Sequence, residues 1–393
     1  NGMNPVYTHY PQAAPSGNVL SLSGQFQWGA ISANTLVVQL TNHQRIQSGI
    51  LFSHGVPVYR FRDNALQKGQ VVPPATVSAQ PVQGTWINGG PTGLTSFSAA
   101  GSHVYLTNGN HWTIVSGSTS TWLAPPQQSA TLPQVDFIAA LPSDPSCAML
   151  MEEYPSGKSL SFVTTNQGTT WTPWPLGQVT ASQLTATAHR FYAIINGTLQ
   201  SSGNGMSWQP VIALNTSQWL VNTYAVNPAN PQQIVISLGP VAGSGMGPVL
   251  QTNDGGKKWH QLPGFPKLGP APSSLVYMAT GNIAALVNLT QPVIVTWHIS
   301  SHNWQITNVP DPANTLGSGE IAATSAGRLI YSSPSGMIYQ ENSQAHNWQE
   351  ILPPAAVTSP DDVASPLVAI GNHQILAAYS KGWYIFVQSA APR

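Results

Sequence analysis

The chain has 393 residues, of which only 6% are Asp, Glu, Lys or Arg, and its formal net charge is zero. Soluble domains usually carry about 25% charged residues. In this chain, the uncharged polar residues Ser, Thr, Asn and Gln must therefore supply most of the solvent-exposed polar surface. With 12 basic residues balanced by 12 acidic ones, the chain lacks the cationic footprint that nucleic acid or an anionic membrane would require. It also has no apolar run of the roughly 18 residues that would span a membrane.

The N-terminal residues 1–17 are polar, contain several turn-forming residues and have no apolar core. We interpret them as a linker left after removal of a targeting segment, which predicts export. From residue 18 onward, short apolar stretches alternate with turns that contain Gly or Pro, a pattern typical of an all-β chain and not of disorder. We therefore predict a linker over residues 1–17 and one β-structured domain over residues 18–390.

The predicted strands fall into consecutive groups of four. The first group covers 36–40, 50–53, 58–62 and 70–72, and the second covers 95–99, 103–107, 111–115 and 121–123. Five further groups occupy 134–175, 183–212, 221–262, 274–309 and 320–352. Three strands remain at the C-terminal end, at 367–370, 374–379 and 383–388. Four short strands with their turns suit a repeat of roughly forty to fifty residues.

The three C-terminal strands need a fourth, which the segment 18–28 would supply. Pairing of the N- and C-terminal strands removes the exposed sheet edges of an open ring. Taken as blades of the β-propeller that the repeat described below implies by resemblance, these groups give a single closed ring of four-stranded antiparallel blades, with eight blades favoured. Seven blades is the alternative, because residues 30–55 are irregular enough to be a long insertion.

A ten-residue repeat marks the middle of the chain. An aromatic or aliphatic residue is followed by Ser or Thr at the third position, Asp, Asn or Gly at the fifth, Gly at the seventh and Trp at the tenth. It runs from Phe162 to Trp171, from Leu199 to Trp208 and from Leu250 to Trp259. The central part predicts a tight turn, since short polar side chains bond backbone amides and glycine accepts positive φ. Weaker copies end at Trp122, Trp304 and Trp348.

This repeat resembles the Asp-box, or BNR, repeat of sialidases, sortilin-type receptors, photosystem assembly factors and some endoglucanases. The resemblance covers roughly residues 55 to 355. It implies a β-propeller in which each box lies between the third and fourth strands of a blade, at the periphery and away from the central site. The residues with this structural role are Asn166, Gly168, Trp171, Gly203, Gly205, Trp208, Asp254, Gly256, Trp259, Trp122, Trp304 and Trp348.

Catalytic residues would have to lie at the starts of the innermost strands, where a propeller forms its central mouth. A glycoside hydrolase needs two carboxylates there, and the alternative catalytic set is Asp136, Glu320, Asp361 and Arg190. A sialidase also needs three arginines that clamp a carboxylate. Arg45, Arg190 and Arg328 are the remaining candidates, but no motif places them together. These residues more often cap strand ends, so we favour the non-catalytic interpretation.

Aromatic platforms would indicate a carbohydrate partner, because flat rings stack on sugar faces. Outside the repeat, the candidates are Trp86, Trp174, Trp219 and Trp297. Each of these more often fills the space between blades than it binds a ligand.

Other chemistry finds little support in the sequence. Histidines are scattered without ligand spacing, so we predict no metal and no cofactor. Cys147 is the only cysteine and is predicted to be a buried, unreactive thiol. Asn196, Asn215 and Asn288 begin glycosylation sequons, and their use depends on the host.

We conclude that the sequence predicts an exported, extracellular or cell-surface, non-catalytic propeller that serves as a binding or structural module. Its partner would be a glycan or a protein at the channel mouth or the blade rim, with lateral self-assembly as a further mode. The alternative is a glycoside hydrolase, sialidase-like or other, that uses channel carboxylates.

Overall fold

A computed structural model describes the backbone of most of the chain. The described residues are 26–32, 35–42, 45–53, 56–62, 75–90, 94, 96–100, 103–108, 111–116, 134–153, 159–175, 181–241, 247–266, 268, 271–287, 292–310, 319–342, 347–355, 357, 367–370, 373–379 and 382–389. They form two compact units, Asn1–Pro74 and Ala75–Arg393. Within the described residues, no helix is long and apolar enough to cross a membrane.

The first unit contains one antiparallel sheet in the order β1-β2-β3-β4. Its strands are β1 (Phe26–Ser32), β2 (Thr35–Asn42), β3 (Arg45–Ser53) and β4 (Val56–Arg62). The predicted strands 36–40, 50–53 and 58–62 lie in this sheet, and the predicted strand 70–72 lies outside the described residues.

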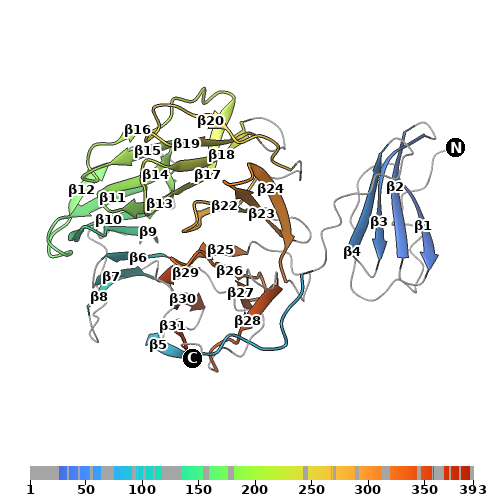
Figure 1. Cartoon of the computed structure of the whole chain (residues 1–393). Helices are drawn as coiled ribbons and strands as arrows, with labels where there is room; N and C mark the ends of the chain where they lie inside the picture. Colours follow the sequence, from blue (N-terminus) through green and yellow to red (C-terminus); the bar gives the residue numbers. More distant parts are fainter. Residues whose placement is uncertain are drawn as a thin grey trace. The chain divides into compact units, whose positions relative to one another are not determined.

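The second unit is a β-propeller of seven blades. Figure 1 shows its sheets arranged as a ring. Blade 1 contains β6 (Ser96–Ala100), β7 (His103–Thr107) and β8 (Trp112–Ser116). Blade 2 contains β9 (Gln134–Leu141), β10 (Asp144–Glu153), β11 (Ser159–Thr164) and β12 (Thr172–Pro175). Blade 3 contains β13 (Ala181–Thr187), β14 (Arg190–Ile195), β15 (Thr198–Ser202) and β16 (Gln209–Pro210). Blade 4 contains β17 (Trp219–Val226), β18 (Ile234–Pro240), β19 (Val249–Thr252) and β20 (His260–Gln261).

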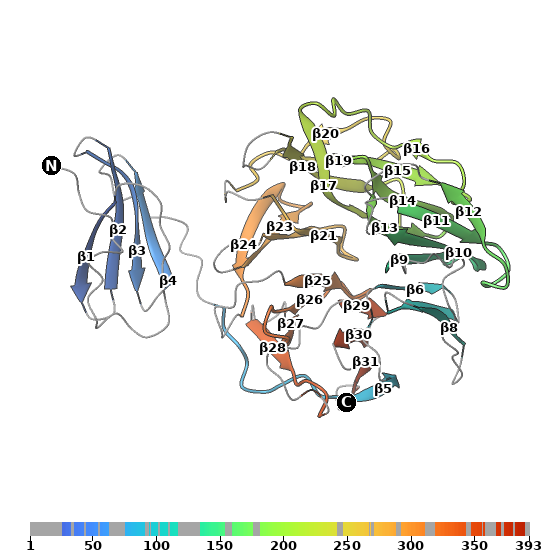
Figure 2. The same cartoon turned by 180° about the vertical axis from the view of Figure 1, so that it is seen from behind.

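Three more blades complete the ring. Blade 5 contains β21 (Ser274–Tyr277), β22 (Ile283–Val287), β23 (Val293–His298) and β24 (Asn303–Asn308). Blade 6 contains β25 (Glu320–Ala323), β26 (Leu329–Ser332), β27 (Ile338–Asn342) and β28 (Asn347–Ile351). Blade 7 contains β29 (Leu367–Ile370), β30 (Gln374–Tyr379), β31 (Gly382–Gln388) and β5 (Gly84–Gly90). Seen from behind in Figure 2, the first strands of the blades surround the centre of the ring.

The ring therefore has seven blades, the alternative count, and not the favoured eight. The extra sheet of the sequence count is the sheet of the first unit, which has the order β1-β2-β3-β4 among the described residues. The closing strand is also different from the one expected. An N-terminal strand does pair with β31, but it is β5 and not the segment 18–28.

Three glycines make β5 a poor strand by propensity, yet the packing requires them. A Cβ atom added at Gly84 would lie 2.3 Å from Cζ of Phe386, and one added at Gly89 would lie 2.3 Å from the ring of Trp383. The aromatic rings of β31 thus lie directly on the backbone of β5. Long-range packing overrides the local preference of this segment.

Residues 75–82 extend the closure to the preceding blade. This segment, called the strap, follows the outer edge of β28: Trp348 N donates to Thr76 O, and Ser78 N donates to Trp348 O. Further along, Val82 N donates to Glu350 O at 2.8 Å. The strap and β5 together join blades 6 and 7.

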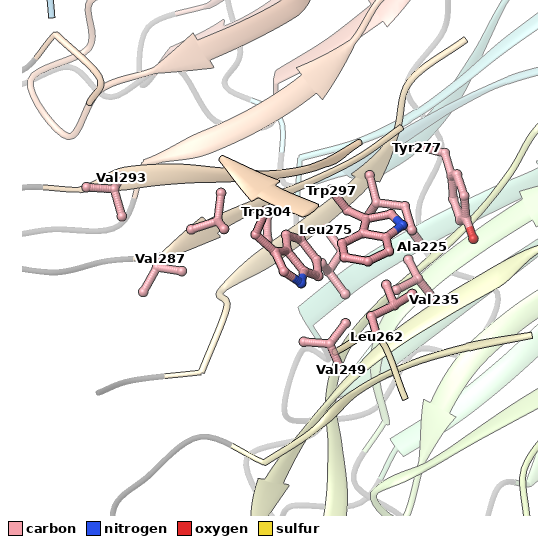
Figure 3. Close-up of a cluster of buried hydrophobic side chains, with 13 residues drawn as sticks. Ala225, Val235, Val249, Leu262, Leu275, Tyr277, Val287, Val293, Trp297 and Trp304 are labelled. Atoms are coloured by element: carbon pink, nitrogen blue, oxygen red, sulfur yellow. The ribbon is translucent and has the colours of Figure 1, made fainter. Parts of the chain in front are cut away.

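Apolar side chains fill the spaces between blades. Figure 3 shows one such cluster, in which Trp297 and Trp304 of blade 5 face Val235, Val249 and Leu262 of blade 4. Both indoles are buried. Similar clusters lie between the other blades described.

Three indole N–H groups connect the outer strands of four successive blades, from blade 4 to blade 7. Trp304 Nε1 donates to Pro263 O at 3.0 Å, Trp348 Nε1 to Asn308 O at 3.1 Å, and Trp86 Nε1 to Leu352 O at 2.6 Å. In each case, a Trp on an outer strand reaches the backbone at the end of the preceding outer strand. Trp86 thus occupies the same structural position as Trp304 and Trp348.

We predict that replacing Trp348 by Ala lowers the free energy of unfolding by about 3–5 kcal/mol, because it empties a site where the indole is buried. Trp348→Phe keeps an aromatic ring and loses the N–H donor, so its loss should be smaller. Chemical denaturation of both variants measures the difference. A loss below about 1 kcal/mol for Trp348→Ala would contradict the role given to this indole.

Candidate functional site

The ten-residue repeat forms the turn between the third and fourth strands of blades 2, 3 and 4. In blade 2, Thr164 Oγ1 donates to Asn166 Oδ1 and accepts from Gly168 N, while Asn166 Oδ1 also accepts from Thr170 N. In blade 4, Thr252, Asp254, Gly256 and Lys258 make the same set of bonds. The polar side chain at the fifth position therefore organises the turn, as predicted.

The Asp254 carboxylate is consequently stabilised in its charged form. The Lys258 backbone N–H, and after it the Thr252 hydroxyl, hold the pKa of Asp254 below its usual value. Asn166 fills the corresponding place without a charge. The shared requirement of these two turns is a hydrogen-bond acceptor.

The blade 3 copy departs from the expected pattern by one residue. Ser202 Oγ donates to Asn204 Oδ1, which accepts from Met206 N and Ser207 N. Asn204 thus takes the acceptor role that the spacing assigned to the position of Gly203. A turn of this kind needs one short acceptor side chain, and Gly203 has none.

The glycines of the repeat lie against the preceding blade. A Cβ atom at Gly168 would lie 2.1 Å from the ring of Trp112, and one at Gly205 would lie 2.6 Å from Val163. At Gly256 it would lie 2.3 Å from Val211 O.

The Trp residues that end the repeat also pack at blade boundaries. Trp171 meets Trp112 edge to face at 4.9 Å between ring centroids. Trp208 and Trp259 are half-buried at the edges of such clusters, and Trp122 lies outside the described residues. The glycines and Trp rings of the repeat therefore pack against the preceding blade.

The candidate ligand face lies where the inner strands begin, because all the blades present these starts at the same end of the ring. Three inner strands carry a bulge near that end, and in each the extra residue is polar: Asp136 in β9, Gln183 in β13 and Asn222 in β17. Glu320 is the first residue of β25. We call this end, defined by these four residues, the strand-start face.

Two of the bulged side chains reach the inner strand of the next blade. Gln183 Nε2 donates to Thr223 Oγ1 at 2.9 Å, and Gln183 Oε1 accepts from Tyr224 N. Asn222 Nδ2 donates to Pro272 O at 2.5 Å, directly before β21. The side chain of Asp136 lies outside the described residues.

Blades 1 and 2, and blades 6 and 7, are joined in a similar way. Ser96 Oγ and Ser98 Oγ accept from Ile138 N and Ala140 N. Glu320 Oε2 accepts from Leu367 N at 2.8 Å, where β29 begins. The sequence analysis missed Gln183 and Asn222. Their signal is a polar residue that interrupts the alternation of an inner strand near its start.

The proposed catalytic residues are spread over the ring. Asp136 and Glu320 belong to blades 2 and 6, and Asp361 lies outside the described residues. Arg190 begins β14 of blade 3, is exposed, and its Nη1 is 3.4 Å from Ser201 Oγ. Arg328 precedes β26 of blade 6, with blades 4 and 5 between the two arginines, and Arg45 lies on β3 of the first unit.

The remaining Trp candidates are placed as follows. Trp297 is buried and packs on Trp304 at 5.1 Å between ring centroids. Trp219 is half-buried at the start of β17, and a Cβ atom at Gly247 would lie 2.6 Å from its ring. The backbone of Trp174 pairs with Ser161, and its side chain lies outside the described residues.

Two acidic residues, Glu152 and Glu153, end the strand β10. Glu152 is completely buried and pairs with Leu160 and Val135. No group of three or more His, Cys, Asp or Glu that would hold a metal occurs among the residues the structure describes.

Cys147 is buried in the cluster between blades 2 and 3. Burial, and after it the nearby Asp144 carboxylate, raise the pKa of this thiol to about 11. The thiolate that would act as a nucleophile is therefore scarce near neutral pH.

We expect the Cys147 thiol to react with a disulfide reagent at pH 8 more than roughly a hundredfold slower in the folded chain than in denaturant. The raised pKa, together with burial, sets this ratio. The absorbance of the released thiolate follows the reaction. Similar rates in both states would contradict the burial of this residue.

Substitutions of Glu320 test whether its carboxylate stabilises the fold through the hydrogen bond to Leu367 N. Glu320→Ala leaves the Leu367 N–H without this acceptor and should cost about 1–3 kcal/mol of unfolding free energy. Glu320→Gln keeps an acceptor oxygen and should cost less. Chemical denaturation of both variants checks this order, and equal losses would contradict the bond to Leu367.

Comparison with known proteins supports the fold. No family model and no curated protein sequence matches the chain. Among solved structures, it is similar to YCF48 bound to D1 peptide, with a TM-score of 0.60, 14% identity, and coverage of 81% of this chain and 99% of that chain. It is also similar to the GH74 xyloglucanase from Xanthomonas campestris, with a TM-score of 0.55 and 15% identity, covering 79% of this chain and 55% of that one. A third similar structure is PorZ, a surface component of the type-IX secretion system of Porphyromonas gingivalis, with a TM-score of 0.51 and 12% identity, covering 79% of this chain and 40% of that one. All of these have propeller folds.

Proposed function

We propose that this chain is an exported, non-catalytic Asp-box propeller that binds an extended segment of a protein partner on the strand-start face. One observation carries the proposal: Glu320, the best-placed candidate carboxylate, accepts the N–H of Leu367 in the next blade. The amides of Gln183 and Asn222 also make contacts between blades. These side chains connect neighbouring blades and so keep the strand-start face rigid. A rigid face favours binding of a partner, and side chains engaged in such contacts are less available for catalysis.

The extent of the structural similarity supports the same choice. The chain covers 99% of the YCF48 chain, which was solved with a peptide, and 55% of the GH74 xyloglucanase chain. The part of the xyloglucanase that has no counterpart here amounts to almost half of that enzyme. A propeller of this extent suffices for peptide binding in the first case, so we favour a protein partner over a glycan.

Binding at the strand-start face is testable with a peptide library displayed on phage and selected on the full chain. We expect enriched peptides that lose at least about tenfold in affinity for Asp136→Lys, which reverses the charge at the bulge near the start of β9. Asp144→Lys makes the same change at the opposite end of the same blade and should leave the affinity unchanged. Equal losses for both variants, or no enriched peptides, would count against the proposal.

A glycoside hydrolase remains the second candidate because of the similarity to GH74 enzymes. Xyloglucan, chromogenic glycosides and sialosides are the substrates to test. We expect no turnover. Turnover that Glu320→Gln abolishes, while the variant stays folded, would replace the binding proposal with catalysis at this carboxylate.

A further inference from the structure

The strand β5 lacks the protections against edge pairing that several other outer strands of the ring have. The outer strand β12 contains Pro173 and Pro175, and β16 and β20 are two residues long. The strap covers the edge of β28. Proline, shortness and cover are the usual protections of a sheet edge against pairing with another chain. Among the described residues, none of them applies to β5, which is seven residues long and contains no proline. The outer strand β24 lacks them as well.

β5 also exposes an apolar side chain at its centre. Ile87 is the middle residue of Gly84–Gly90 and is 53% exposed. Val77 on the strap and Leu352 after β28 are likewise among the exposed large hydrophobic residues. By contrast, the outer strand β24 exposes Asn303 and Gln305. The sequence between Lys68 and Asp136 contains no Asp, Glu, Lys or Arg, so two paired β5 strands would not themselves bring like charges together.

Hydrogen-bonded and non-hydrogen-bonded residues alternate along β5, and this alternation determines which backbone N–H and C=O groups face away from the sheet. Ser389 N donates to Gln83 O, so this pair is hydrogen-bonded, and such pairs alternate with non-hydrogen-bonded ones. Following the register, Thr85 and Ile87 direct their N–H and C=O groups toward β31. Trp86 and Asn88 direct theirs away from the sheet.

This phase fits a two-fold axis at Ile87. In an antiparallel pair of two β5 strands centred there, Trp86 of one copy faces Asn88 of the other, and both carry outward N–H and C=O groups. The two Ile87 residues then form a non-hydrogen-bonded pair, the kind in which side chains lie closest. Thr85 faces Gly89 of the second copy, so no bulky residue crowds the pair of isoleucines.

We propose that two copies of this chain associate through antiparallel pairing of their β5 strands, with Ile87 opposite Ile87 on a two-fold axis. Blade 7 of each copy thereby becomes one half of a continuous eight-stranded sheet. The partner is a second copy, because the outward hydrogen-bonding groups, the exposed isoleucine and the absence of charge are all self-complementary about one point. This association is independent of the ligand proposed for the strand-start face.

Sedimentation velocity of the full chain over a wide concentration range tests the association. We expect a monomer–dimer equilibrium that Ile87→Lys weakens by at least about tenfold, because it places two like charges at the axis. Val241→Lys changes another exposed apolar residue and should leave the dimer intact. A chain that stays monomeric, or an equal effect of both variants, would overturn the proposal.

Cysteine cross-linking tests the register. With Cys147 replaced by Ala, Ile87→Cys places two thiols on a pair whose Cα atoms are about 4.5 Å apart, within the disulfide range of about 4.4–6.8 Å. Mild oxidation should give a covalent dimer. The matched variant Thr85→Cys, also exposed, puts the two Cα atoms roughly 13 Å apart and should give none. Dimer formation by Thr85→Cys at the same rate, or none by Ile87→Cys, would overturn the two-fold register.

Discussion

Closure of the ring is the constraint on which the other features depend. Each blade buries its faces against its neighbours, so the first and last blades are stable only if the ends of the sequence of blades meet. Here β5 supplies the last strand of blade 7, and the strap continues along β28. The rings of Phe386 and Trp383 lie on the backbone of Gly84 and Gly89, where any other residue would separate the strands.

Two sets of polar contacts hold the closed ring in one geometry. At the outer periphery of the ring, the indoles of Trp86, Trp304 and Trp348 donate to backbone carbonyls of the preceding blade. At the centre, Gln183 and Asn222 bind the following blade. Most of these donors and acceptors are neutral. Burying a neutral polar group between packed sheets costs less solvation free energy than burying an ion. The low charge content of this chain agrees with the use of neutral groups at these contacts.

The strand-start face shows why a fold does not by itself specify an activity. Structures with a similar fold include a protein solved with a bound peptide and GH74 enzymes, so the fold alone does not distinguish these activities. In this chain, Glu320 accepts a backbone N–H across a blade boundary, and Arg190 and Arg328 belong to separate blades. The side chains of Glu320, Gln183 and Asn222 all make contacts between blades on this face.

The sequence by itself determined the local features: the all-β class, the strands between residues 134 and 352, and the turns of the repeat around Asn166 and Asp254. These depend on alternation and on acceptor side chains that act within a few residues. Only the tertiary structure decided the number of blades, the closing strand, the shift to Asn204 and the partners of Trp86 and Glu320. A separate sheet and a blade have the same local pattern, and a glycine-rich strand such as β5 forms only because the edge of β31 and its aromatic rings accept it.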